Sequence, residues 1–244
     1  RRCEDACTRG TVDQAVAIDE VKKFIAQQDL DAETRYIPKK VVPSLNGSFS
    51  EKVAIIGAGP AGLSCAFYLA EKGYSPVIFE KNEKPGGMLR YGIPSFKLEK
   101  DVIDAEIDII KAMGVEIKCG IEVGKDVTLD ELRAQGYKAF YIAIGCQGGR
   151  KAGIPGEDAE GVMTAVDFLR TVGADESYPV TGKAVVVGGG NVAIDVARTA
   201  QRCGAESVAM FCLEPRDKMP ASEEEIAEAL EEDVTIDCGW GPKE

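Results

Sequence analysis

The chain has 244 residues, of which 45% are hydrophobic and 29% are charged, as is ordinary for a soluble protein of one large or two modest domains. A formal net charge of −12 argues against nucleic acid as a partner, and the absence of histidine excludes imidazole catalysis, including Ser-His-Asp and Cys-His hydrolysis, by residues of this chain. With no apolar run of about 18 residues and no signal-peptide pattern, we expect no membrane association and a cytoplasmic location.

Two cysteines near the N-terminus, Cys3 and Cys7, have a spacing typical of metal ligands. A one-turn helical pair of small residues explains that spacing about as well. Apolar residues at helical spacing follow in residues 11–28, and residues 31–47 are polar and contain proline, as in a linker. We therefore predict a short helical segment and a linker in residues 1–50.

The eight cysteines are too few and too scattered for a disulfide framework. Cys65, Cys203 and Cys212 fall in apolar helix or strand patterns, which predicts buried free thiols. Free thiols fit a reducing compartment.

The first of two glycine-rich fingerprints follows an apolar strand pattern at residues 53–56 and opens a helical pattern at residues 63–70. Its glycines permit a tight turn and let a pyrophosphate approach the helix N-terminus. The next strand, residues 76–79, is followed by Glu80, 23 residues after Gly57, where an acid would bind the adenosine ribose hydroxyls. A turn that only lets helix and strand pack would explain a glycine but not this acid. The fingerprint residues are Gly57, Ala58, Gly59, Pro60, Ala61 and Gly62.

The region between the two fingerprints begins with residues 84–94, which are too rich in glycine and proline for a regular element. A helix is predicted at residues 98–113 and a strand at residues 115–118. An apolar strand at residues 138–145 ends in glycine, and small residues there would permit a cofactor to approach closely. A helix at residues 162–172 leads on to the second fingerprint.

The second fingerprint repeats the first, with a strand at residues 183–187 before it and a helix at residues 192–203 after it. Another strand, residues 207–212, precedes Glu214, which lies 26 residues after Gly188. The fingerprint residues are Gly188, Gly189, Gly190, Asn191, Val192 and Ala193. One Rossmann unit binds one dinucleotide, so two units imply electron exchange between two carriers, typically a flavin and a nicotinamide. The alternative is that one of the two sites is vestigial.

We therefore predict an α/β fold with two Rossmann-like units, in residues 51–180 and 181–244. After an acidic helix at residues 222–232, whose charged face we expect to be solvated, only one short strand remains at residues 234–236. A dinucleotide domain normally needs more strands, and the first residue is not methionine. The sequence is thus expected to be a fragment of a longer polypeptide, with both units incomplete.

The order and content of these motifs resemble the flavin half of the glutamate synthase small-subunit family. The resemblance covers nearly the whole chain. The matching runs are residues 57–63, Glu80 with Lys81, residues 86–94, residues 96–98, residues 188–200 and residues 219–221. It implies a glutathione-reductase-like fold in which a nicotinamide domain is inserted into an FAD domain.

The resemblance also implies roles for individual residues. FAD would bind residues 57–62, with Glu80 on the ribose, Val123 by the adenine, and residues 143–145 beside the pyrophosphate. The candidate FAD-binding residues outside the fingerprint are Glu80, Lys81, Gly87, Met88, Leu89, Arg90, Gly92, Ile93, Val123, Ala143, Ile144 and Gly145. The candidate residues for the nicotinamide nucleotide are Gly188, Gly189, Gly190, Asn191, Val192, Asp195 and Glu214. No catalytic residue is assigned.

In this family the N-terminal extension carries two iron-sulfur clusters, and Cys3 and Cys7 match the last two cysteines of its CPxxCExxC-type run. The resemblance thus implies a cluster in the intact protein and none in this fragment, which lacks the upstream ligands. The closing FAD strands are expected beyond Glu244, so whether the fragment retains FAD is left open.

The sequence departs from the family pattern at Cys212, Leu213 and Glu214. NADPH-using relatives carry Tyr-Arg-Arg in that position, where the arginines bind the 2′-phosphate. A carboxylate at Glu214 predicts NAD(H) in preference to NADP(H). The alternative is that Glu214 faces solvent and Arg216 binds the phosphate.

The leading hypothesis is an FAD-dependent NAD(H) oxidoreductase that passes electrons through iron-sulfur centres to a partner subunit or domain, the final acceptor being left open. A pyridine nucleotide-disulfide reductase is a weaker hypothesis, because no CxxC or CxxxxC follows Gly62 and Cys65 stands alone. A scaffold subunit that uses a degenerate nucleotide fold to bind a partner is the third.

Overall fold

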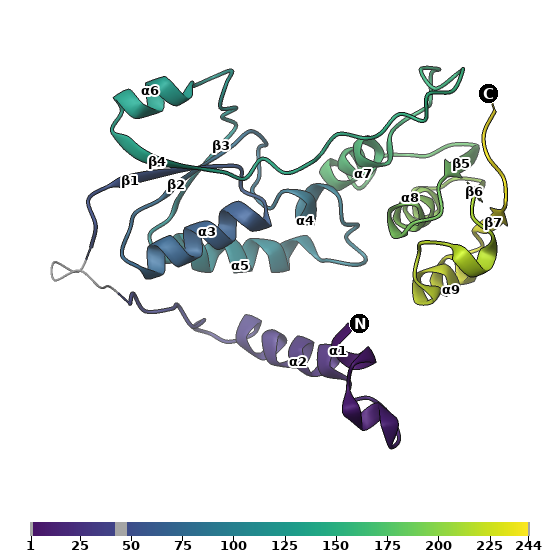
Figure 1. Ribbon diagram of the computed structural model, residues 1–244, viewed down its shortest axis with the longest axis horizontal. Coiled ribbons are helices and arrows are strands. Elements are labelled where there is room, and N and C mark those ends of the chain that lie inside the picture. Colours follow the sequence, from purple (N-terminus) through teal and green to yellow (C-terminus); the bar gives the residue numbers. More distant parts are fainter. Residues whose placement is uncertain (1, 42–47, 244) are drawn as a thin grey trace.

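The structure is a computed structural model that describes residues 2–41 and 48–243. It contains two parallel sheets joined by a helical connection, with a helical arm at the N-terminus (Figure 1). The α/β class and the two Rossmann-like sheets confirm the fold that the sequence predicts. No helix within the described ranges is long and apolar enough to cross a membrane.

The first sheet has the order β3-β2-β1-β4 and is parallel throughout. Its strands and helices follow the strand-helix-strand order of a Rossmann unit up to β2. The strands are β1 (Lys52–Ile56), β2 (Val77–Glu80), β3 (Glu116–Cys119) and β4 (Tyr137–Ile142), and the helices are α3 (Pro60–Glu71), α4 (Met88–Tyr91), α5 (Lys100–Ala112) and α6 (Leu129–Ala134).

Helices cover both faces of this sheet. Successive residues of a strand point to opposite sides, so each strand contributes to both packing layers. Ile55 and Ile78 pack with α3 and α5, which run side by side (Figure 1). Ala54, Ile56 and Phe79 pack on the other face with Leu132 of α6 and with Tyr137. The apolar runs read as buried strands are thus confirmed, and their carboxyl ends lie where α3 begins.

Helix α6 was not predicted, although its sequence carries a helix-start signal. Thr128 accepts a hydrogen bond from the Glu131 N–H at 3.2 Å, and Glu131 accepts one from the Thr128 N–H at 2.7 Å. This capping box satisfies two backbone donors that a short helix would otherwise leave open. The sequence pattern Thr-x-x-Glu was available and was missed because so few apolar residues follow it.

The expectation that residues 84–94 lack regular structure was wrong for four of them, which form α4. Gly87 has a φ of 56°, a conformation that reverses the chain just before the helix. Gly92 follows as the C-terminal cap. Glycine at both ends, which suggested a loop, here bounds a single helical turn.

The second sheet is parallel and has the order β5-β6-β7. Its elements are β5 (Lys183–Val187), β6 (Ser207–Cys212), β7 (Thr235–Cys238), α7 (Ala165–Ala174), α8 (Asn191–Arg202), a 3₁₀ turn (Arg216–Lys218) and α9 (Glu223–Glu231). Ile194 of α8, Met210 of β6 and Ile226 of α9 are fully buried at the centre of its core.

Helix α7 packs into this second core through Phe168 and Leu169. This packing places α7 with the second core. The predicted division of the chain into domains, with a boundary between residues 180 and 181, stays a prediction. Because α7 also contacts α4, it lies between the two units.

The N-terminal arm consists of α1 (Arg2–Asp5), a 3₁₀ turn (Thr8–Thr11) and α2 (Ile18–Leu30). The helix predicted in residues 11–28 thus begins seven residues later than expected. None of the residues of α2 is buried. Of the predicted linker, residues 42–47 lie outside the described part of the chain.

All eight cysteines are free thiols, and all lie within the described ranges. The prediction of burial holds for Cys212, whereas Cys65 and Cys203 are only half-buried. Burial raises the pKa of the Cys65 and Cys203 thiols, which keeps them protonated and poorly nucleophilic.

An acid at the end of α9 ties that helix to α8. Glu232 accepts hydrogen bonds from Arg202 at 2.7 Å and from Arg198 at 2.6 Å. The bond from Arg202, with a further contribution from Arg198, lowers the pKa of Glu232 to about 2. The Arg198 side chain is only 8% exposed and also pairs with Glu228, so removing the Glu232 charge leaves this largely desolvated guanidinium with one carboxylate partner fewer.

We expect Glu232→Gln to lower the free energy of unfolding at pH 7 by about 2 kcal/mol. A carboxyl whose pKa is depressed in the folded state stabilises the fold above its ordinary pKa of 4.5, and this contribution fades as the pH falls toward about 2. Urea unfolding at pH 7 and near pH 2 measures the effect, and the variant and the unmodified protein should have equal stability at the lower pH. An equal difference at both pH values would contradict this assignment.

Candidate functional site

The first glycine fingerprint forms the turn between β1 and α3. Gly57 has a φ of 105°, and a Cβ on it would collide with the carbonyl oxygen of Ala143 just beyond β4. A Cβ on Gly62 would collide with the carbonyl oxygen of Gly57. Both glycines are therefore required by the turn itself.

Gly59 differs from these two glycines, because among the described residues a Cβ there would have only the Gly87 Cα within 4 Å, at 3.8 Å. Gly59 is the N-terminal cap of α3, and Pro60 begins the helix. The fold thus leaves room beside the first turn of α3, where backbone N–H groups favour a phosphate. This is the cradle that a dinucleotide pyrophosphate needs.

The segment before α4 closes over the same loop. A Cβ on Gly87 would lie 2.7 Å from the Gly59 Cα, and the Gly86 N–H donates to the Ala58 carbonyl at 2.9 Å. The structure thereby brings together Gly59, Gly87 and Ala143, which are distant in the sequence.

Glu80 is a buried acid at the end of β2, with 4% of its surface exposed. It accepts hydrogen bonds from the Ala58 N–H at 2.7 Å and from the Asn82 N–H and side-chain amide at 2.9 and 2.6 Å. These bonds fix the carboxylate beside the glycine loop, with acceptor capacity left for ribose hydroxyls. Together with the open space at Gly59, this arrangement fits the adenosine part of FAD.

The remaining candidate FAD residues fall into two groups. Arg90 is buried and its guanidinium is engaged by the Pro85 carbonyl at 2.8 Å and by Asp104. Lys81, Ile144 and Gly145 are exposed. The others are partly or fully buried, namely Met88, Leu89, Gly92, Ile93, Val123 and Ala143. Contact of each residue with FAD stays a prediction.

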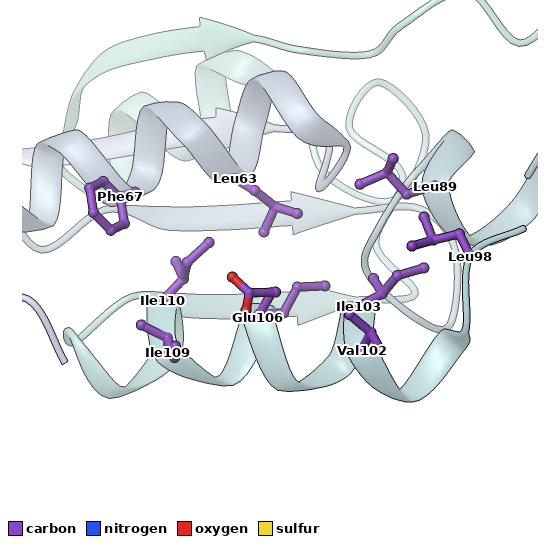
Figure 2. Close-up of a pocket in the computed structure, with 10 residues that line it drawn as sticks. Leu63, Phe67, Leu89, Leu98, Val102, Ile103, Glu106, Ile109 and Ile110 are labelled. Atoms are coloured by element: carbon purple, nitrogen blue, oxygen red, sulfur yellow. The ribbon is translucent and has the colours of Figure 1, made fainter. Parts of the chain in front are cut away.

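An apolar groove lies between α3 and α5 (Figure 2). It is lined by Leu63, Phe67, Leu89, Leu98, Val102, Ile103, Glu106, Ile107, Ile109 and Ile110. Glu106, the one acid among these ten residues, accepts a hydrogen bond from Arg35 and offers no donor for a phosphate, and Leu89 is the one candidate site residue among them. The groove is therefore distinct from the dinucleotide cradle.

The second glycine fingerprint has the same construction. Gly188 has a φ of 140°, and a Cβ on Gly189 would lie 2.9 Å from the Cys212 Cβ. Among the described residues nothing lies within 4 Å of a Cβ on Gly190, the N-terminal cap of α8. Gly190 thus leaves the same open space at a helix start as Gly59 does in the first unit.

Residues 219–222 brace this second loop. The Ala221 N–H donates to the Gly189 carbonyl at 3.0 Å, and the Ser222 N–H donates to the Asn191 side chain at 3.0 Å. In the sequence, residues 219–221 could be recognised only as one of the runs that resemble the family, with no structural role assigned to them. The structure assigns them a supporting role that only the folded chain reveals.

Glu214 lies half-buried beside the second loop, and a Cβ on Gly189 would stand 3.3 Å from one of its carboxylate oxygens. Like Glu80 it lies beside its glycine loop, but it is not at the same strand position: the Gly57 and Gly188 N–H groups donate to the carbonyls of Phe79 and Phe211, so Cys212 corresponds to Glu80 and Glu214 lies two residues further on. Arg216, the alternative phosphate ligand, donates to both carboxylate oxygens of Glu223 at 3.0 and 2.8 Å. Its charge is offset by that acid.

Asp195 lies on the first turns of α8, and its carboxylate is 2.5 Å from the Lys97 ammonium. Burial raises the pKa of Asp195 despite the opposing effect of Lys97. Contact between Asp195 and a nucleotide stays a prediction. Lys97 was noticed in the sequence only as part of a matching run.

Cys3 and Cys7 lie in the N-terminal arm, on and just after α1. Backbone N–H groups of Val16, Arg9 and Gly10 hydrogen-bond the Cys7 sulfur and lower the pKa of its thiol, the Val16 bond most strongly. Such donors favour a thiolate, the form that binds iron. The described residues contain no group of three or more potential ligands, so a complete cluster would need others, and the cluster stays a prediction.

We expect Cys3→Ser and Cys7→Ser in the full-length protein to lower bound iron and sulfide and to leave flavin reduction by NADH unchanged. Chemical analysis of iron and sulfide, with Cys203→Ser as the control, measures the effect. An unchanged iron content would show that Cys3 and Cys7 are not cluster ligands but an ordinary pair of thiols one helical turn apart.

A family model described as pyridine nucleotide-disulphide oxidoreductase matches residues 51–237, a span that contains both glycine loops. The chain belongs to this family.

Among curated proteins, the chain is 38% identical over 247 residues to the glutamate synthase (NADPH) small chain of Escherichia coli K12, covering 96% of this chain and 51% of the relative. It is 40% identical to the NAD-dependent dihydropyrimidine dehydrogenase subunit PreT of Escherichia coli O157:H7, covering 98% and 56%. It is 41% identical to the NADP(+)-dependent formate dehydrogenase subunit beta of Moorella thermoacetica, covering 95% and 35%. These similarities confirm the resemblance inferred from the motifs. The chain spans about half the length of most of these relatives, or less.

Two solved structures show the same fold. Mycobacterium tuberculosis FprA in complex with NADPH has a TM-score of 0.62 at 24% identity, over 75% of this chain and 48% of that one. Lactococcus lactis thioredoxin reductase has a TM-score of 0.58 at 23% identity, over 80% and 66%.

Proposed function

We propose that the chain is the flavin- and nucleotide-binding part of an NADH-oxidising enzyme of the glutamate synthase small-subunit type. The observation that carries the proposal is the repeated cradle: Gly59 and Gly190 each cap a helix beside open space, with an acid, Glu80 or Glu214, next to each loop. In a vestigial site we would not expect both the open space at the capping glycine and the acid beside the loop.

The roles of the residues follow from this geometry. FAD, when bound, accepts a hydride from a nicotinamide and releases electrons singly. The first turn of α3 would bind the FAD pyrophosphate, and Glu80 would accept hydrogen bonds from the ribose. The first turn of α8 and Glu214 would do the same for NADH. The chain supplies binding, orientation and exclusion of water, and none of its residues is assigned as an acid or base.

The route of the electrons beyond the flavin is part of the proposal. We infer that Cys3 and Cys7 would be two of the ligands of an iron-sulfur centre in the full-length protein, and that this centre would supply electron transfer to a partner subunit or domain. Support comes from the N–H groups around Cys7 and from relatives named as subunits of larger enzymes. The partner and final acceptor are not identified by this chain.

A disulfide reductase would need a second thiol within reach of Cys65, which lies on α3. The other seven cysteines stand in other elements, and the pKa of Cys65 is raised by burial. We therefore do not assign that activity, although the family carries its name.

The test is an anaerobic titration of the full-length protein with NADH. Flavin bands at about 375 and 450 nm should be present, and the latter should bleach as NADH is added. A protein that purifies without these bands would be a scaffold. A flavoprotein that dithionite reduces but neither nicotinamide nucleotide reduces would contradict the proposed function.

A further inference from the structure

Three consecutive residues of the first unit, Ser95, Phe96 and Lys97, contact the second unit. They lie in the segment between α4 and α5, with three residues between them and the end of α4. Ser95 hydrogen-bonds to Glu176, just after α7. The matching run at residues 96–98 had no role in the predictions from sequence.

Lys97 reaches two acids of the second unit at once. Its ammonium is 2.5 Å from the Asp195 carboxylate on α8 and is hydrogen-bonded to Glu225 on α9. The three side chains are only 21%, 15% and 22% exposed. Burial acts to lower the pKa of Lys97, but the two carboxylates outweigh it and the pKa is raised. The ammonium is therefore charged at neutral pH.

Phe96 lies against two arginines of helix α8. The guanidinium carbons of Arg202 and Arg198 are 4.1 and 4.8 Å from the centre of its ring. Both arginines are held in turn by Glu232. Asp195, Arg198 and Arg202 recur at the spacing of one helix face, so one side of α8 is matched to two neighbouring residues of the first unit.

The contact of residues 95–97 with the second unit lies only a few residues along the chain from each candidate binding site. Residues 87–93, which close over the FAD cradle, end two residues before Ser95. Helix α8, which Lys97 and Phe96 contact, begins at the nucleotide loop. A buried ion pair contributes little net stability but is strongly directional, so such a contact fixes orientation more than it adds stability.

From this arrangement we propose that Lys97, supported by Phe96, is a positioning residue that sets α8 relative to the flavin cradle. The inference rests on the proposed function. Reaction requires donor and acceptor atoms about 3 to 3.5 Å apart, and a misplacement of about 1 Å can lower the rate about a hundredfold. Lys97 is assigned no contact with either dinucleotide; it acts through Asp195 and Glu225.

The test compares Lys97→Met, which removes the charge and keeps most of the side-chain length, with Lys97→Arg, which restores the charge. Lys111→Met is the matched control, because Lys111 is an exposed lysine of the same unit paired with Asp108. Each is made in the full-length flavoprotein. Flavin content, the dissociation constant for NAD⁺ and the limiting rate of flavin reduction are measured separately.

We expect Lys97→Met to lower the limiting rate at least tenfold, with flavin content and the dissociation constant within about twofold of the unmodified protein. Lys97→Arg should recover most of the rate, and Lys111→Met should not change it. Amide hydrogen exchange supplies a readout that does not depend on the reaction: peptides covering residues 93–98 and the start of α8 should exchange faster in Lys97→Met only.

An unchanged limiting rate in Lys97→Met overturns the inference, as does faster exchange without a slower rate. If Lys97→Met fails to retain flavin, Phe96→Leu takes its place and should give a smaller loss of rate. An unmodified protein that no nicotinamide nucleotide reduces counts against the proposed function, and the hydrogen-exchange comparison then still decides whether Lys97 holds the two units together.

Discussion

Replacing Gly59 with valine in the full-length protein is expected to abolish FAD binding while the second unit stays folded. The protein itself leaves a Cβ at this position free, since its nearest neighbour would be the Gly87 Cα at 3.8 Å. The side chain would instead occupy the space in which the pyrophosphate approaches the helix. Flavin content by absorbance measures the effect, and circular dichroism reports the fold.

Gly62→Val is the matched control for this prediction. Its Cβ would collide with the Gly57 carbonyl, so it should destabilise the first unit whether or not flavin is present. Loss of flavin with an intact fold is thus specific to Gly59. If Gly59→Val retained stoichiometric flavin, the assignment of this loop would be wrong.

The second large effect concerns the choice of nicotinamide nucleotide. We expect NADH to be preferred over NADPH by roughly a hundredfold in kcat/KM, or about 3 kcal/mol. Glu214 lies beside the second loop, where a carboxylate accepts hydrogen bonds from two ribose hydroxyls and repels a 2′-phosphate. The bidentate pairing of Arg216 with Glu223 leaves that arginine's charge offset. Curated relatives include enzymes named for each nucleotide, so this residue-level prediction is informative.

Stopped-flow reduction of the full-length flavoprotein by each nucleotide measures the preference. The control is the double substitution Leu213→Arg/Glu214→Arg, which removes the repelling charge and should reverse the preference. Leu213 is exposed, so its replacement leaves the core intact. Equal rates of flavin reduction by NADH and NADPH in the unmodified protein would contradict the prediction.

What the sequence predicted well is local. Glycine spacing, apolar strands and an acid after the second strand are all consequences of short-range backbone geometry, and the structure places both acids beside their loops. What it missed depends on contacts between distant residues. The placement of α7 in the second core is set by the packing of Phe168 and Leu169, which an amphipathic pattern alone cannot assign to either unit.

The contacts of Lys97 illustrate the same limit. A single lysine in a glycine- and proline-rich stretch is indistinguishable in sequence from a solvated one. Its meaning depends on Asp195 and Glu225, which lie about 100 and 130 residues away along the chain. The bracing of the second loop by Ala221 has the same origin, because it is a backbone contact that no side-chain pattern records.

The central claim is that the two glycine loops bind different dinucleotides, and a comparison of Gly59→Val with Gly190→Val tests it most directly. Both positions are helix caps beside open space, so the two substitutions are chemically equivalent. The measurement is flavin content together with reduction by NADH and by dithionite, in the full-length protein. We predict that Gly59→Val purifies without flavin, whereas Gly190→Val retains flavin that dithionite reduces and NADH does not. Loss of flavin from both variants, or normal reduction by NADH in Gly190→Val, would contradict the claim.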